Sequence, residues 1–150
     1  MRRLLEIAGE RGLFVEWSRD MGERLRAVYE HEARTITLNA WMSAEQQRFA
    51  LAHELGHAWH GHTYTGRIHL DAEAERLADE HAASLLIDPG AYARAERLRG
   101  PHPAAIADEL AVHPDVVVIF QRMLGRSAPA ARRRPWGGAG WLQSHQDLTA

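Results

Sequence analysis

Apolar and polar residues follow two different periods along the chain, and the change of period separates an N-terminal sheet from a helical body. A short helix is predicted over residues 2–8. Apolar and polar residues then alternate over residues 13–17, 25–29 and 35–38. Alternation with a period of two is typical of half-buried strands. We therefore predict three short strands in an antiparallel meander.

From residue 44 onward the apolar residues recur at helical spacing. Ser43 followed by Gln46 is a capping-box start, and Gly61 is a typical helix stop, so we predict a helix over residues 44–60. Its broad apolar stripe consists of Phe49, Ala52, Leu55, Ala58 and Trp59. Such a stripe indicates a helix that packs against the interior of a domain.

A second long helix is predicted after a loop over residues 61–70. Asp71 is its expected N-cap, and the helix runs to about Ile87 because Pro89-Gly90 ends it. Three further helices are expected over residues 91–99, 103–111 and 114–124. The predicted fold class is α+β, with a small antiparallel three-stranded sheet packed beside a mainly helical body.

Composition limits the chemistry that this chain can perform. Its 150 residues suffice for one domain, predicted over residues 1–125, while residues 126–150 read as a flexible tail rich in Arg, Pro, Gly and Trp. Ten histidines and no cysteine exclude disulfides and thiolate sites, so histidine and carboxylate must hold any metal. No run suggests a signal peptide or membrane span, and we expect a cytoplasmic protein. A formal charge of −2 gives no general attraction to nucleic acid.

The candidate chemistry lies in the first long helix, where His53-Glu54-Leu55-Gly56-His57 is an H-E-x-x-H motif. Histidines four residues apart lie on one face of a helix, where both imidazoles can bind one zinc ion. A catalytic zinc keeps one position open for water. Glu54 would take the proton of that water as it attacks a polarised carbonyl. The motif therefore predicts a metallopeptidase with one zinc per chain.

A third ligand is needed, and the spacing leaves two candidates. His60 lies about 10 Å along the helix from His53, too far for one ion to reach both easily. A carboxylate from the next helix meets the requirement, but spacing alone does not separate Glu75 from Glu73. Asp79, four residues after Glu75, could accept the free ring N–H of a liganding histidine.

Two segments together resemble the ImmA/IrrE family of zinc metallo-endopeptidases. The first is Arg48 to His57, with the sequence RFALAHELGH, and the second is Glu75 to Pro89, with the sequence ERLADEHAASLLIDP. The resemblance implies a zincin-like body with the metal held between two helices. It also implies that His53, His57 and Glu75 bind zinc, that Glu54 is the general base, and that Asp79 takes the family's Asn/Asp position.

The chain departs from the family pattern at two positions. His81 replaces a phenylalanine, and Asp88 is inserted before Pro89. His81 is either a core substitute for that phenylalanine or a donor that contacts the substrate carbonyl and stabilises the developing oxyanion. The other nearby histidines are expected to form a polar rim rather than to bind metal. These are His60, His62 and His69.

The family resemblance implies a protein substrate, namely a helix–turn–helix transcriptional repressor of a phage, mobile element or stress response. The alternative is a non-catalytic, metal-stabilised domain that sequesters a repressor or toxin. A third hypothesis is DNA binding by the helix–turn–helix-like closing helices over 103–124, but their apolar second helix favours packing. We expect no direct nucleic-acid or membrane binding, although the tail could engage a partner. Histidine and carboxylate ligands at this spacing are also compatible with a divalent metal other than zinc.

Overall fold

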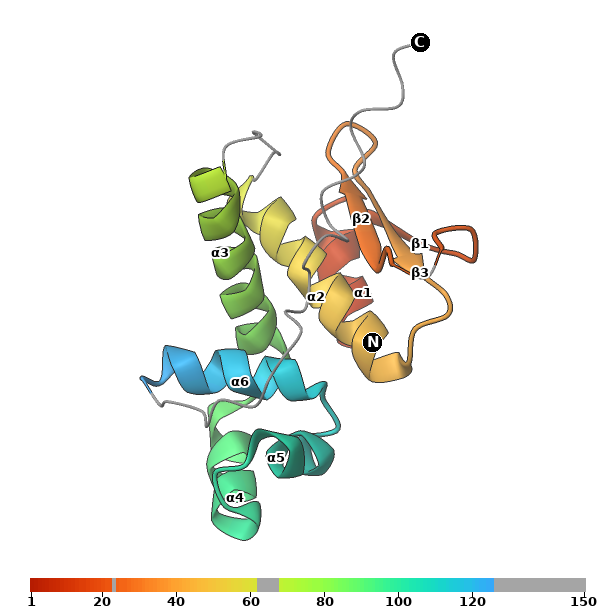
Figure 1. Cartoon of the computed structure of the whole chain (residues 1–150). Coiled ribbons are helices and arrows are strands. Elements are labelled where there is room, and N and C mark those ends of the chain that lie inside the picture. Colours follow the sequence, from red (N-terminus) through yellow and green to blue (C-terminus); the bar gives the residue numbers. More distant parts are fainter. Residues whose placement is uncertain (23, 62–67, 126–150) are drawn as a thin grey trace.

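The computed structural model describes residues 1–22, 24–61 and 68–125, with the backbone alone for residues 68–70. These described residues form six helices beside a small sheet (Figure 1). The helices are α1 (Arg2–Glu10), α2 (Ala44–His60), α3 (Ile68–Leu86), α4 (Pro89–Arg99), α5 (Pro103–Leu110) and α6 (Pro114–Met123). The strands are β1 (Phe14–Ser18), β2 (Ala27–Glu30) and β3 (Thr35–Asn39). The α+β class is confirmed.

The predicted antiparallel meander is wrong in the order and direction of its strands. The sheet has the order β1-β3-β2, with β1 parallel to β3 and β2 antiparallel to β3. Only β2 and β3 form the expected hairpin, because their connection is short. The longer segment 19–26 lets the chain cross to the far edge of the sheet, so no local constraint makes β1 and β2 neighbours.

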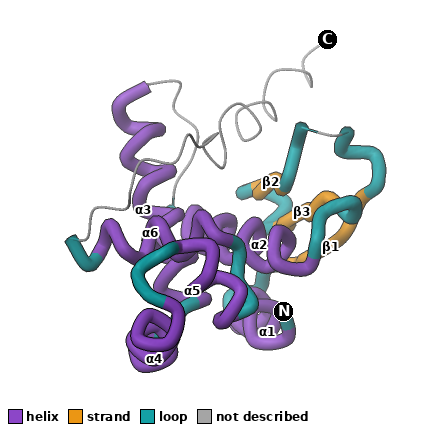
Figure 2. The backbone as a smooth tube through the Cα atoms, turned by 60° about the horizontal axis from the view of Figure 1, so that its bottom comes forward, coloured by secondary structure: helices purple, strands orange, loops and turns teal. Residues whose placement is uncertain are grey.

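Strand β3 is central because it carries the most deeply buried side chains of the sheet. Ile36 and Leu38 are fully buried, and they lie opposite inward-facing residues of both edge strands. Helices α1 and α2 cover this inner face. Figure 2 shows the strands gathered at one side of the helical part. The other face, which carries Phe14 and Glu16, is open to solvent.

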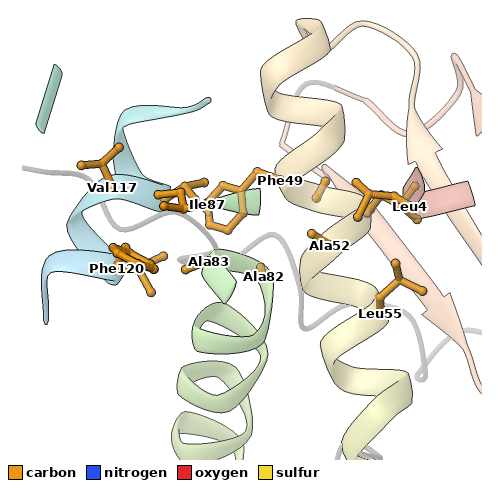
Figure 3. Packing of buried hydrophobic residues seen from close by; sticks show 14 of the residues in the cluster. Leu4, Phe49, Ala52, Leu55, Ala82, Ala83, Ile87, Val117 and Phe120 are labelled. Carbon is orange, nitrogen blue, oxygen red and sulfur yellow. The ribbon is translucent and has the colours of Figure 1, made fainter. Parts of the chain in front are cut away.

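Helix α2 lies between the sheet and α3 and is buried on nearly all sides (Figure 1). Every residue from Phe49 to Gly56 is buried, so its interior part is more than the one-sided stripe that the sequence predicts. Figure 3 shows Phe49 reaching from α2 toward Ile87 and α6. At the C-terminal end the predicted stripe fails, because the Trp59 side chain is 55% exposed.

Helix α3 begins before its predicted N-cap. It starts at Ile68, so Asp71 lies in the first turn instead of capping it. A carboxylate there still interacts favourably with the positive end of the helix dipole. The inserted Asp88 has a clear local role, because it is the N-cap of α4 and accepts a hydrogen bond from the Ala91 backbone N–H at 2.7 Å. Pro89 is then the first residue of α4, where a missing N–H costs nothing.

The closing helices α5 and α6 pack as part of the core. The apolar run of α6 from Val116 to Phe120 is buried, and α6 contacts both α3 and α5. Its apolar side chains therefore serve packing, as expected from their composition. Within the described residues, the helices are all too short or too polar to traverse a lipid bilayer.

The tightest contact between α2 and α3 occurs at Gly56. A Cβ atom placed on Gly56 would lie 2.8 Å from the Ala78 Cα and 2.9 Å from the Ala78 carbonyl oxygen. Real side chains do not tolerate such distances, so the two backbones can approach this closely only because Gly56 has no side chain. The pair of small residues thus sets the spacing between the two helices.

We expect Gly56→Ala to push α2 and α3 apart and to lower the free energy of unfolding by about 1–3 kcal/mol, as overpacking typically does. Urea denaturation measures this change. The matched control is Gly9→Ala, because a Cβ on this helical glycine meets nothing within 4 Å. Gly9→Ala should leave stability unchanged or raise it by about 0.5–1 kcal/mol. Equal effects of both substitutions would contradict the role of the close contact.

Candidate metal centre

Helix α2 begins and ends where the sequence predicts, so the H-E-x-x-H motif lies inside a regular helix. The Ser43 side chain accepts the Gln46 N–H, and the Gln46 side chain accepts the Ser43 N–H, which completes the capping box. Gly61 ends the helix in the left-handed conformation, at φ 64°. Because the helix is regular between these ends, His53 and His57 lie one turn apart on one face.

Three side chains from α2 and α3 converge on one point. His53 Nε2 lies 2.9 Å from His57 Nε2 and 3.4 Å from Glu75 Oε2, and His57 Nε2 lies 3.2 Å from Glu75 Oε1. A tetrahedral zinc with bonds near 2.0–2.1 Å holds neighbouring ligand atoms about 3.3 Å apart. The two imidazole nitrogens lie near this spacing, and each is close to one of the two carboxylate oxygens of Glu75. One ligand atom from each of His53, His57 and Glu75 can be chosen so that all three lie within 4.8 Å of one another, and this group could hold a metal ion.

Asp79 lies where it can orient the first histidine. Its Oδ1 is 2.8 Å from His53 Nδ1, and the His53 side chain is only 1% exposed. With the proton of neutral His53 on Nδ1 and donated to Asp79, the lone pair of Nε2 faces Glu75 and His57. A metal-binding histidine is commonly held in this tautomer by an outer carboxylate. The predicted contact between Asp79 and a histidine of the motif is present.

Glu75 rather than Glu73 faces the two histidines. Burial raises the pKa of Glu75, but hydrogen bonds from His53 and His57 outweigh it and lower this pKa to about 2. Glu75 is thus an anion at any working pH, as a metal ligand must be. Glu73 is exposed and lies 3.8 Å from the Arg76 guanidinium. The geometry thus favours Glu75 over Glu73 as the third member of a metal group.

The metal-free site favours a proton at His53. Burial lowers the pKa of His53, but the hydrogen bonds to Asp79 and Glu75 and the nearby charges raise it to about 10. A cation bound at Nε2 would take the place of this proton, so we expect metal uptake to release protons near neutral pH. The preference for positive charge follows from the three carboxylates around the two imidazoles, which belong to Glu54, Glu75 and Asp79.

Glu54 is buried beside this group, with only 3% of its surface exposed. Burial raises its pKa, the two histidines lower it, and Glu75 raises it further, with a net increase. Its Oε1 is buried and makes no hydrogen bond to the protein that the structure describes. A carboxylate of raised basicity beside a candidate metal site suits the acceptance of a proton from water.

His81 is placed with a different set of side chains. Its ring packs against Trp59 at 5.4 Å and against His60 at 5.8 Å between centroids. Six residues after Glu75, it points about 120° away from Glu75 around the helix axis. These contacts of His81 do not support its role as an oxyanion donor, which stays a prediction. His60 is exposed and outside the metal group, whereas the side chains of His62 and His69 lie outside the described residues.

The sequence interpretation misses Gly56 and Ala78 as determinants of this site. Their contact brings α3 close enough for Glu75 to reach the two histidines. The sequence does contain a signal, because each of the two long helices carries a small residue at this contact. An analysis of helical periodicity considers only the positions of apolar side chains, so it does not reveal where two backbones can approach closely. Phe49 is predicted only as core, although its ring also packs edge-on against His53 at 6.4 Å between centroids.

Comparison with known families places this geometry in context. The family model Peptidase_M78, described as the IrrE N-terminal-like domain, matches residues 9–119. The match includes both segments of the metal group and extends from the end of α1 into α6. It confirms the resemblance that the two motifs carry. A search of the curated proteins finds no match.

We expect Glu75→Ala to remove most of the bound metal, because it deletes one of three converging ligands. Metal content after incubation with zinc and gel filtration measures this loss by elemental analysis. Glu73→Ala is the matched control, since it removes a carboxylate two residues away that faces Arg76 instead. The control should keep the wild-type zinc content. Equal retention by both variants would show that Glu75 is not a ligand.

Proposed function

The chain belongs to the Peptidase_M78 family, and from this premise we propose that it is a zinc-dependent endopeptidase that hydrolyses a protein substrate. Family membership supports a metallopeptidase-type activity. The observation that carries the proposal is the convergence of His53, His57 and Glu75, with the buried carboxylate of Glu54 beside them. A site that merely stabilised the fold would need the three ligands but not Glu54.

The proposed roles follow from the contacts of each side chain. His53, His57 and Glu75 would hold the ion, and Asp79 would keep the His53 ring in the required tautomer. When bound, zinc would supply a Lewis acid that polarises the scissile carbonyl and acidifies a water molecule. Glu54 would accept a proton from the attacking water and return it to the leaving amine.

The raised pKa of Glu54 suits this shuttle. A carboxylate with an ordinary pKa near 4.3 is a weak base at neutral pH, whereas burial brings its basicity closer to the working pH. The two nearby histidines lower the pKa of Glu54 and so oppose part of the effect of burial. The site thus combines a proton acceptor of raised basicity with a group of side chains that could hold a cation.

For the substrate we propose a helix–turn–helix transcriptional repressor, in the cytoplasm, as the resemblance to the ImmA/IrrE family implies. Zinc as the metal is part of the same proposal, because its preference for nitrogen and carboxylate ligands in a tetrahedron fits the observed spacing. The alternative of a sequestering domain shares the metal group but gives Glu54 no task. Glu54 is therefore the residue that distinguishes the two functions.

We expect Glu54→Gln to lower the rate of peptide hydrolysis by about 10²–10⁴-fold while the protein keeps its zinc and its melting temperature, since the change removes only the proton acceptor. Mass spectrometry of a proteome-derived peptide mixture, incubated with the zinc-loaded protein, measures hydrolysis of any susceptible sequence in the mixture. Purified helix–turn–helix repressors encoded near this gene can be tested in the same assay.

Glu73→Gln is the control for this substitution, because it makes the same chemical change at an exposed position of α3. It should keep wild-type activity. If the Glu54→Gln protein cleaved peptides at the wild-type rate, Glu54 would not be the base. If no variant cleaved any peptide but the zinc-loaded protein bound a repressor tightly, the sequestering function would replace the enzyme.

A further inference from the structure

A second cluster of ionisable side chains lies away from the metal group, around the exposed ring of Trp59. Trp59 follows His57 by two residues, so its side chain points about 200° away from His57 around the axis of α2. The Arg11 guanidinium lies over the Trp59 ring, 3.7 Å from its centroid, and the His81 ring of α3 packs against the same indole. Arg11, Trp59 and His81 form the Trp59 cluster.

Arg11 is held in this position by its backbone as well as by its side chain. Its backbone N–H donates to the Ala8 carbonyl oxygen at 3.1 Å, at the end of α1. The guanidinium of Arg34, in the turn between β2 and β3, donates to the carbonyl oxygens of Arg11 and Gly12. Gly12 has a φ of 65°, a left-handed conformation that suits glycine. The Arg11 side chain therefore starts from a fixed backbone, and its stacking on Trp59 limits the rotamers that it can adopt.

Stacking on an aromatic ring leaves the hydrogen-bonding groups of an arginine available. The N–H donors of a guanidinium lie in its own plane, so a ring beneath that plane does not occupy them. The ion pairs of arginines among the described residues involve other arginines, and none includes Arg11. The Trp59 side chain is 55% exposed, so a ligand can reach this place from solvent. Arg11 thus presents ordered donors in the fork geometry that matches an oxyanion.

The local charge of the Trp59 cluster also favours an anion. Burial lowers the pKa of His81, and the nearby His60 and Arg11 lower it further. No carboxylate of the described residues offsets these contributions to the pKa of His81. In the metal group the balance is opposite, because three carboxylates surround two imidazoles and favour a cation. The pair of helices α2 and α3 thus carries two clusters with opposite preferences for charge.

A second arginine–tryptophan pair in the chain provides an internal comparison. The Arg19 guanidinium lies over the Trp41 ring at 5.5 Å from its centroid, a looser contact than that of Arg11 with Trp59. None of the described histidines packs against the Trp41 ring. This pair therefore has the same two types of side chain without the close stacking and without the neighbouring imidazole.

We propose that the Trp59 cluster binds an oxyanion group, whose source is a free phosphate or the carboxylate of an acidic side chain. Arg11 would donate to two oxygen atoms of this group, and Trp59 would hold the guanidinium in place. His81, at a position where the resembled family has a phenylalanine, would contribute a polar ring to the surroundings of the anion. The proposal is independent of the proposed peptidase function, because none of the three side chains belongs to the metal group.

The test is a titration of the zinc-loaded, full-length protein with inorganic phosphate at constant ionic strength, while NMR follows the indole N–H signals of Trp59 and Trp41. Trp59→Phe and Trp41→Phe assign these signals. We expect a saturable shift of the Trp59 signal and none of the Trp41 signal. Arg11→Gln should weaken phosphate binding about tenfold, because it removes charge-assisted hydrogen bonds. Arg11→Lys keeps the charge but loses the fork, so its affinity should lie between those of the wild type and Arg11→Gln.

Arg19→Gln is the matched control, since it makes the same change in the looser arginine–tryptophan pair, and it should leave the Trp59 titration unchanged. Melting temperatures show whether each variant is folded, and Arg11→Lys gives the same comparison if Arg11→Gln does not fold. The proposal would be overturned by the absence of a saturable Trp59 shift or by unchanged affinity in a folded Arg11 variant. Equal shifts of both tryptophans would also overturn it, because they would indicate a general effect of salt.

A second titration identifies the source of the oxyanion. Glutamate capped at both ends carries the carboxylate of an acidic side chain without the other charges of a free amino acid. Tighter binding of inorganic phosphate would assign the Trp59 cluster to a phosphate group, and tighter binding of capped glutamate would assign it to an acidic side chain of a partner protein. The absence of a saturable Trp59 shift with both compounds would reject the site. Neither titration requires peptide hydrolysis, so the result does not depend on whether the protein is a peptidase.

Discussion

The close approach of α2 and α3 at Gly56 and Ala78 is the constraint on which the metal group depends. Two histidines on one helix cannot complete a tetrahedral site, because the next position on the same face is too distant along the axis. The third ligand has to come from a second backbone, and Glu75 reaches the histidines only because the helices are in backbone contact. The packing of α2 in the core and the position of Glu75 therefore depend on the same contact between the two helices.

That packing brings together charges that would be costly without a cation. Three carboxylates surround two imidazoles, and both His53 and Glu54 are almost completely buried. A divalent ion held by His53, His57 and Glu75 would neutralise part of this charge and would take the place of the proton on His53. The raised basicity of Glu54 and the orienting contact of Asp79 arise from the same crowding. The crowding of buried charges opposes folding, and the same crowding raises the basicity of Glu54, which suits proton transfer.

Local signals predict the parts of the site that depend on local structure. The capping box at Ser43 and the stop at Gly61 give α2 its observed bounds, and hence the shared face of His53 and His57. Glu75 needs the family resemblance, because helix spacing cannot tell which carboxylate faces a neighbouring helix. The predicted sheet order fails because strand pairing is decided by long-range burial of β3. The predicted start of α3 fails because Asp71 suits a first turn as well as an N-cap.

The most direct test of this account is the X-ray absorption spectrum of the zinc-loaded wild-type protein, together with its zinc content. The account predicts about one zinc per chain, bound by two imidazole nitrogens near 2.0–2.1 Å and by oxygen ligands at about 2.0–2.2 Å. It would be contradicted by a protein that binds no stoichiometric zinc, or by a zinc whose ligands lack the two imidazoles.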